Sequence, residues 1–289
     1  MNVTLPNEKA IKKKQMIIYV LIILFCVISI IIAFYVQFYA RIDFGKMLGI
    51  SANQEGSFGN KAQEQILDLE TNFDKIFTNN IENDNGENDA KKIDANNNLV
   101  YTKYEKKEIK QNSYDLEIRI PTINIDTEII SKYNEEIEET YARNALNVLN
   151  SQNRNIIFTV EYTANVYNGI LSLIIRSNLK EGSNAQRVII QTYNYDLRNN
   201  KEISLEEVLA IEHLDKENVQ NRIKTKIEEE QKRADELNKL GYTIYTRDVQ
   251  NDMYKIENTQ EFYLTNDTLY IIYPYGNESE TSETDLIVL

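Results

Sequence analysis

The sequence predicts an α+β fold, an antiparallel sheet covered by helices, preceded by one N-terminal transmembrane helix. Residues 16–40 contain no charged side chain. Residues 158–166 alternate strictly between apolar and polar side chains and lead into Asn168-Gly169, the favoured two-residue hairpin turn. Strand-like and helix-like segments then alternate irregularly, without a glycine-rich turn between a strand and a helix, and this favours an antiparallel sheet with helices packed on it.

The apolar run at residues 16–40 is long enough to cross a membrane. From Ile17 to Val36 it consists almost wholly of Ile, Leu, Val, Phe and Tyr, and about 20 such residues span a bilayer core. A cleaved signal peptide would have a shorter apolar run that ends in small residues. This run ends in QFYA at residues 37–40, so we expect an uncleaved signal anchor.

The charges beside the apolar run predict its orientation. Lysines gather before it, at positions 9, 12, 13 and 14, and few cations follow closely. Residues 1–15 are therefore expected to be a cytoplasmic tail. The only cysteine, Cys26, lies inside the apolar run, so the outer region has no disulfide, which suits a bacterium. The predicted location is a bacterial cell membrane, crossed once, with an extracellular C-terminal domain.

Residues 41–98 are interpreted as a juxtamembrane connector. Within it, Ile66, Leu69, Phe73 and Ile76 form one apolar stripe at helical spacing. Such a stripe would pack on the domain or on itself, lie on the membrane surface, or pair with a partner. We expect it to pack on the domain or on itself. Residues 79–98 are rich in Asn, Asp, Glu and Gly, a composition typical of a flexible linker.

Residues 99–289 have the pattern of a folded domain. Residues 100–108 and 114–120 alternate as strands, and Pro121 is expected to close the second. Asp126 is a candidate N-cap for a helix with the apolar face Ile130, Tyr133, Ile137, Tyr141 and Val148. Across the Asn168-Gly169 turn, Tyr167 should face Ile170. The residue numbers of every further pair of facing residues should also sum to 337.

The second half of the domain continues with one strand, two helices and three strands. Residues 186–197 are expected to form the strand, and Ser204 with Glu207 matches a capping box for a short helix. A longer helix ends before Gly241 and carries Val219, Ile223, Ile227, Ala234 and Leu237 on one face. The closing strands are expected at residues 260–265, 269–274 and 285–288.

Net charge and motifs exclude several classes of function. The chain has 32 basic and 45 acidic residues. Four of the basic residues and one of the acidic residues lie in residues 1–40. Residues 41–289 therefore contain 28 basic and 44 acidic residues, a net charge of −16. Such a domain repels nucleic acid and favours cationic partners. The single histidine, His213, cannot build a histidine-rich metal site, and no phosphate-binding loop or zinc motif is present. We therefore expect no enzyme activity and no cofactor.

Several segments resemble a known bacterial family. Residues 191–197 (QTYNYDL) and 201–209 (KEISLEEVL) resemble one block of an extracytoplasmic domain of unknown function. That domain occurs in the lysozyme-responsive anti-sigma-V factor and beside some polysaccharide deacetylases. Residues 262–275 resemble its last block, and residues 114–134 a companion segment. The resemblance covers roughly residues 99–289 and implies a fold, not a reaction. Where the family often has Gly-Gly-Ala-His, this chain has SNAQ at residues 183–186.

These observations lead to a functional hypothesis. The chain is expected to be a membrane-anchored cell-envelope binding or sensing protein that recognises a lysozyme-like cationic protein or a wall glycan. An anti-sigma-type signal transducer is the alternative, although the tail is short for folding around a sigma factor; a surface enzyme acting on wall polymer is the third. Tyrosines on strands either form a recognition surface or pack within the sheet. The candidate ligand-binding residues are Ser183, Asn184, Gln186, Tyr193, Tyr195, Tyr273 and Tyr275.

Overall fold

The computed structural model describes residues 73–77, 81–83, 91–93, 98–275 and 282–289. The chain divides into two units, residues 1–59 and 60–289, and all the described residues lie in the second. The predicted tail, membrane helix and most of the connector lie outside the described residues. In the part of the chain that is described, no helix has both the length and the apolar character that a membrane span needs.

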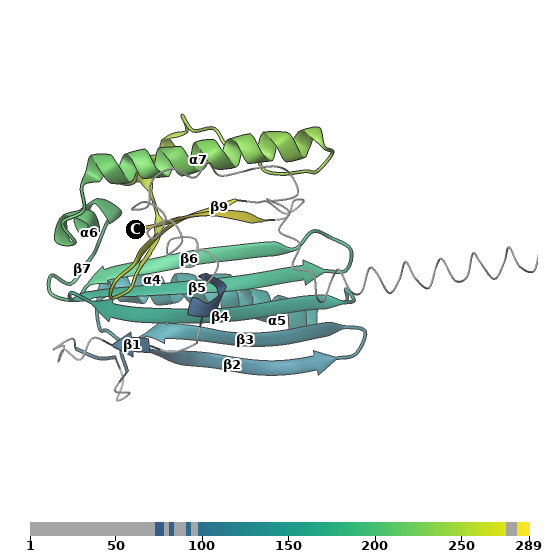
Figure 1. The fold of residues 1–289 in the computed structure, drawn as a ribbon. Coiled ribbons are helices and arrows are strands. Elements are labelled where there is room, and N and C mark those ends of the chain that lie inside the picture. The colour runs from purple at the N-terminus through teal and green to yellow at the C-terminus, as the bar shows by residue number, and fades with distance from the viewer. Residues whose placement is uncertain (1–72, 78–80, 84–90, 94–97, 276–281) are drawn as a thin grey trace, which may run out of the picture. The chain divides into compact units, whose positions relative to one another are not determined.

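The main sheet has the strand order β2-β3-β4-β5-β6-β7, and β1 lies beside β4 (Figure 1). Its strands are β1 (Ile81–Asn83), β2 (Val100–Lys110), β3 (Tyr114–Ile123), β4 (Ile156–Tyr167), β5 (Ile170–Glu181), β6 (Arg187–Asp196) and β7 (Lys201–Glu202). Most neighbours are antiparallel, as predicted, but β1 and β3 both pair with β4 in parallel. The sheet is therefore mixed, because a helical crossover between β3 and β4 returns the chain in the same direction.

The crossover consists of α4 (Glu128–Ile137), a π-helical turn (Glu138–Ala142) and α5 (Arg143–Asn150). Its N-cap is Thr127 and not the predicted Asp126. The Thr127 hydroxyl oxygen accepts a hydrogen bond from the backbone N–H of Ile130 at 3.3 Å. The backbone N–H of Asp126 instead donates to the Lys91 carbonyl at 2.8 Å, so long-range pairing of Asp126 moves the cap by one residue.

A second sheet and two helices complete the domain. The sheet has the order β10-β9-β8, with β8 (Glu261–Leu264), β9 (Leu269–Tyr275) and β10 (Glu283–Val288). The helices are α6 (Leu205–Ile211) and α7 (Lys216–Lys239), and single 3-10 turns lie at Phe73–Ile76, Asp252–Tyr254 and Ile256–Asn258. The capping box that was predicted at the start of α6 is confirmed.

Pro121 does not close its strand. Strand β3 continues to Ile123, and Pro121 pairs with Thr102. The register shifts between Thr102 and Tyr104, so the proline lies beside a bulge, one of the places where a sheet tolerates the loss of a backbone donor. The hairpin after it is as predicted: β4 and β5 pair Tyr167 with Ile170 and keep that register to their ends.

The main sheet buries both of its faces. One face packs against α4 and α5, and this core includes Leu171, Leu173 and Ile175 of β5. The alternate residues Ile170 and Ile174 face the second core, built with the small sheet, α6 and α7. Figure 1 shows α4 and α5 behind the main sheet, and α7 beyond the small sheet. Phe73 and Ile76 of the predicted stripe pack on the domain, as does the neighbouring Phe77; Ile66 and Leu69 lie outside the described residues.

Candidate functional site

The predicted turn residues lie at the exposed end of the β5–β6 hairpin. Ser183, Asn184 and Gln186 are all exposed. Gly182 takes φ +52°, which allows the tight turn. The turn is also held from outside, because the backbone N–H of Ser282 donates to the Gln186 carbonyl at 3.3 Å. It is therefore linked to the start of β10.

The four predicted tyrosines lie in the interior. Tyr193, Tyr195, Tyr273 and Tyr275 are each less than a tenth exposed. The first two lie on the face of β6 that packs against the α4–α5 layer, whereas Tyr273 packs in the core on the other face. Tyr193 lies seven positions after Gln186, which directly precedes β6, and this corresponds to roughly 23 Å along an extended strand. The seven candidate residues thus do not form one surface, and their role in binding stays a prediction.

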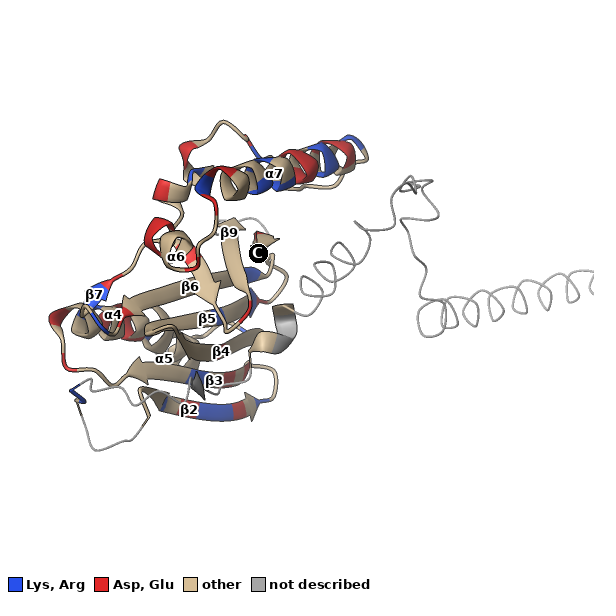
Figure 2. Cartoon of the chain, turned by 60° about the vertical axis from the view of Figure 1, so that its left-hand side comes forward, with Lys and Arg blue, Asp and Glu red and all other residues tan. Residues whose placement is uncertain are grey.

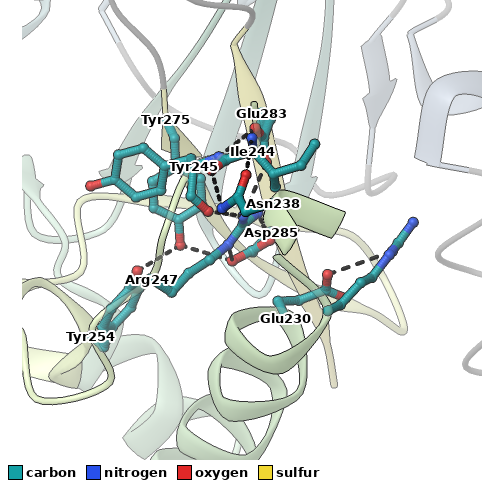
Figure 3. A network of polar contacts seen from close by, with 10 residues as sticks. Glu230, Asn238, Ile244, Tyr245, Arg247, Tyr254, Tyr275, Glu283 and Asp285 are labelled. Carbon is teal, nitrogen blue, oxygen red and sulfur yellow. Dashed lines mark hydrogen bonds and ion pairs between the residues drawn. The ribbon is translucent and has the colours of Figure 1, made fainter. Parts of the chain in front are cut away.

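Tyr275 belongs to a buried polar network around Arg247 (Figure 3). Arg247 is 4% exposed and lies in the segment between α7 and β8. Its Nε and Nη2 donate to Asp285 at 3.0 and 2.7 Å, and its Nη1 donates to Glu283 at 3.0 Å. Tyr275 donates its hydroxyl to Asp285 at 2.9 Å, and the hydroxyl of Tyr254 lies 2.9 Å from that of Tyr275.

The carboxylates neutralise the buried guanidinium. Burial alone would lower the pKa of Arg247, but the hydrogen bonds and charges of Asp285 and Glu283 outweigh it and raise that pKa above its ordinary value. Burial raises the pKa of Tyr275, and the charge of Asp285 adds to the effect. Both groups therefore keep their protons across the physiological range.

The network holds an exposed apolar loop in place. We call residues 240–245 the aromatic loop. Its side chains Leu240, Tyr242 and Tyr245 are 74%, 62% and 37% exposed. Tyr245 stacks on Tyr275 with ring centroids 4.4 Å apart, and its backbone N–H donates to Glu283 at 2.8 Å. The loop is therefore anchored on β9 and β10.

The end of α7 sets the direction of the aromatic loop. Gly241 has φ +92°, and the backbone N–H of Tyr242 donates to the Leu237 carbonyl at 3.1 Å, which is a Schellman ending. The side chain of Asn238 then bonds both the N–H and the carbonyl of Ile244, at 2.8 and 3.0 Å. A backbone restrained in this way presents its apolar side chains at low entropic cost on binding.

A cavity of about 640 Å³ lies beside the network, between α7, β10 and the β5–β6 edge. Four basic residues, Arg176, Lys226, Arg233 and Arg247, line it together with the three acidic residues Glu230, Glu283 and Asp285, so the cavity has no excess of negative charge. Along α7 itself, acidic and basic residues alternate (Figure 2) and pair one turn apart, as in Lys226–Glu230 at 3.5 Å. Among the described residues, no group of three or more His, Cys, Asp or Glu side chains could hold a metal ion.

Sequence reasoning missed the aromatic loop and Arg247. The predicted binding residues included tyrosines at strand positions. Successive side chains of a strand point to opposite faces of the sheet, and both faces of the main sheet are covered here, so these tyrosines are buried. The available signal was the position of Tyr242 and Tyr245 in a loop just after the helix-ending Gly241, because loop aromatics have no sheet face to fill. Nothing in the sequence pattern pairs Arg247 with Asp285, 38 residues away.

Comparison with known proteins gives only distant similarity. No protein-family model matches the chain, and no curated protein matches it. A DUF3298 family protein from Bacteroides fragilis is 15% identical over 60% of this chain and 81% of its own, with a TM-score of 0.32. A DUF3298 family protein from Pseudomonas aeruginosa is 11% identical over 69% of this chain and 89% of its own, with a TM-score of 0.36. At these TM-scores the similarities carry no argument about function, and the link to the anti-sigma-V factor stays a prediction from the residues.

Proposed function

We propose that this chain is a membrane-anchored binding or sensing protein of the bacterial cell envelope, without catalytic activity of its own. Its ligand is a cationic protein such as a lysozyme, or a wall glycan. The observation that carries the proposal is the aromatic loop, because it exposes Leu240 and two tyrosines and its Tyr245 is anchored on the buried network through Tyr275 and Glu283 (Figure 3). Tyrosine is enriched among the residues that dominate binding energy at interfaces.

The charge of the domain supports the choice of ligand. Its net charge of −16 over residues 41–289, from 28 basic and 44 acidic residues, favours encounter with a basic protein. Tyrosine rings also offer flat apolar faces with a polar edge, which suit sugar rings as well as protein surfaces. The apolar run at residues 16–40 supports the membrane anchor.

The test is a titration of the full-length chain in mild detergent against a basic lysozyme and, separately, against soluble wall-glycan fragments. Leu240→Ser and Tyr242→Ala should each weaken binding about tenfold or more, with no change in thermal stability. Ile109→Ser is the matched control, because Ile109 is 71% exposed on β2 and is not in the aromatic loop.

Each outcome is decisive. Binding by the wild type that the loop variants weaken, and the control does not, supports the proposal. Binding that all three variants leave unchanged would move the site away from the aromatic loop. If the wild type binds neither ligand, the proposed recognition is wrong.

A further inference from the structure

A second cleft, on another side of the domain, has an unbalanced negative charge. We call it the α4–β8 cleft: it has a volume of about 710 Å³ and lies between α4, the end of β6, and the start of β8. Its charged lining residues are Glu136, Glu202, Glu207, Glu261 and Lys132. The volume is within the range of small-ligand pockets, about 300–1,000 Å³.

Two of the five charges are already paired. Lys132 bridges Glu128 at 3.0 Å, on the same helix, and Glu207 pairs with Lys201. Glu136, Glu202 and Glu261 form no ion pair with any residue that the structure describes. Four acidic residues therefore line the cleft with Lys132 as the single basic lining residue, in a domain that already carries excess negative charge.

Glu261 is held in place as an acceptor. Its Oε2 accepts hydrogen bonds from the backbone N–H of Thr192 at 2.6 Å and from the Thr192 hydroxyl at 2.9 Å. Its Oε1 has no hydrogen-bond partner within the described segments. The carboxylate is thus oriented by β6, with one oxygen left to accept from a ligand.

A buried hydroxyl in the same cleft lacks a partner. Tyr193 is 5% exposed, and its hydroxyl makes no hydrogen bond to the described part of the chain. Tyr193 lines the cleft together with Glu136 and Glu261. Burial raises the pKa of its phenol, and the charges of these two carboxylates add to the effect. The ring of Tyr133 packs against that of Tyr193, with centroids 5.0 Å apart.

Two further buried polar atoms, from residues outside the lining of this cleft, also lack partners within the ranges that the structure describes. The hydroxyl of Tyr141, fully buried on the π-helical turn, and Oε1 of Gln191 on β6 also lack hydrogen-bond partners among the described residues. Burial raises the pKa of Tyr141, and Tyr193 and Glu261 add to the effect. A buried hydroxyl without a partner destabilises a fold, and π-helical turns occur often at functional sites.

We propose that the α4–β8 cleft binds the ammonium group of a lysine side chain presented by a basic protein or peptide. The ammonium supplies three N–H donors and no acceptor, and the cleft supplies the matching acceptors: Glu136, Oε1 of Glu261 and the phenol oxygen of Tyr193. A metal ion is a poorer occupant, because the described residues contain no group of three candidate ligands. The tyrosine rings add attraction for a cation.

The test uses a fluorescein-labelled octalysine peptide and the full-length chain in mild detergent, followed by fluorescence anisotropy at about 150 mM salt, where distant surface charges are screened. Glu136→Gln should weaken binding at least about tenfold, as expected for a lost charge-assisted contact. Glu229→Gln is the matched control, because Glu229 is an exposed residue of α7 outside the cleft. It should weaken binding less than about twofold.

Tyr193→Phe separates binding from folding. Its hydroxyl has no bond to lose in the free protein, so the variant should keep or raise the thermal midpoint while binding octalysine several-fold more weakly. A lowered midpoint with unchanged binding would show that the hydroxyl is structural and overturn the proposal. Equal weakening by Glu136→Gln and Glu229→Gln would reduce the effect to general charge attraction and also overturn it, as would no binding at all.

Two further measurements identify the ligand class and the site that binds it. Displacement of the labelled peptide by glucosamine oligomers at lower concentrations than unlabelled octalysine needs would transfer the cleft to amino sugars and overturn the assignment to a protein. Tyr242→Ala, in the aromatic loop, should leave octalysine binding unchanged. Failure of the α4–β8 cleft is thereby distinguishable from failure of the aromatic loop.

Discussion

Replacing Asp285 by Ala would leave the guanidinium of Arg247 buried with fewer partners. The side chains of Arg247 and Asp285 are 4% and 2% exposed, and two hydrogen bonds of 3.0 and 2.7 Å join them. The substitution removes both, together with the hydroxyl contact from Tyr275 at 2.9 Å. Glu283 remains 3.0 Å from Arg247, and its side chain is 22% exposed.

The magnitude follows from this geometry. Removing one partner of a buried ion pair costs about 3–5 kcal/mol, because a charge stays buried without compensation. Glu283 still offsets part of the charge, so we expect a loss near the lower limit, about 3 kcal/mol. Replacing both partners, in Arg247→Met with Asp285→Leu, should recover most of this loss, because apolar replacements of similar volume carry no desolvation penalty.

The assay is urea unfolding, followed by far-UV circular dichroism, of the wild type, Asp285→Ala, Arg247→Met, Asp285→Leu and the double variant Arg247→Met with Asp285→Leu. The double-mutant cycle should give a coupling free energy of about 2–3 kcal/mol. A loss below about 1 kcal/mol for Asp285→Ala would refute the inference that the pair is buried and tightly bonded. A double variant no more stable than Asp285→Ala would refute the uncompensated charge as the cause.

Two further predictions concern Glu261 and Gly169. Burial raises the pKa of Glu261 above 4.5, so this carboxyl stabilises the fold below pH 4.5 and loses that contribution as the pH rises through the raised pKa. Glu261→Gln should therefore be more stable than the wild type in urea at neutral pH, and a difference that persists unchanged near pH 4 would contradict this. Gly169 has φ +76°, and an added Cβ would meet Nε of Arg198 at 2.6 Å. Gly169→Ala should lower the free energy of unfolding by about 1–2 kcal/mol and by more than Gly241→Ala, which meets nothing within 4 Å; equal losses would leave backbone strain as the only cause.

Local signals predicted much of the domain. The Asn168-Gly169 turn determined the whole β4–β5 register, because a two-residue turn leaves one pairing and the alternating pattern extends it. The Ser204–Glu207 capping box placed the start of α6 correctly. These features depend on residues a few positions apart. Where a distant partner intervened, as Lys91 does at Asp126, the local prediction moved by one residue.

The tertiary structure decided how these elements meet. The parallel pairing of β3 with β4 and the two covered faces of the main sheet arise from long-range packing, and that packing turned Tyr193, Tyr195, Tyr273 and Tyr275 into interior residues. The candidate sites have the same origin. The sequence by itself determined the acidic charge, the apolar run at residues 16–40 and the local turns and caps. Only the fold placed Arg247 on Asp285, or brought three carboxylates and one unpartnered phenol into the same cleft, because such arrangements join segments whose spacing in the chain carries no periodic signal.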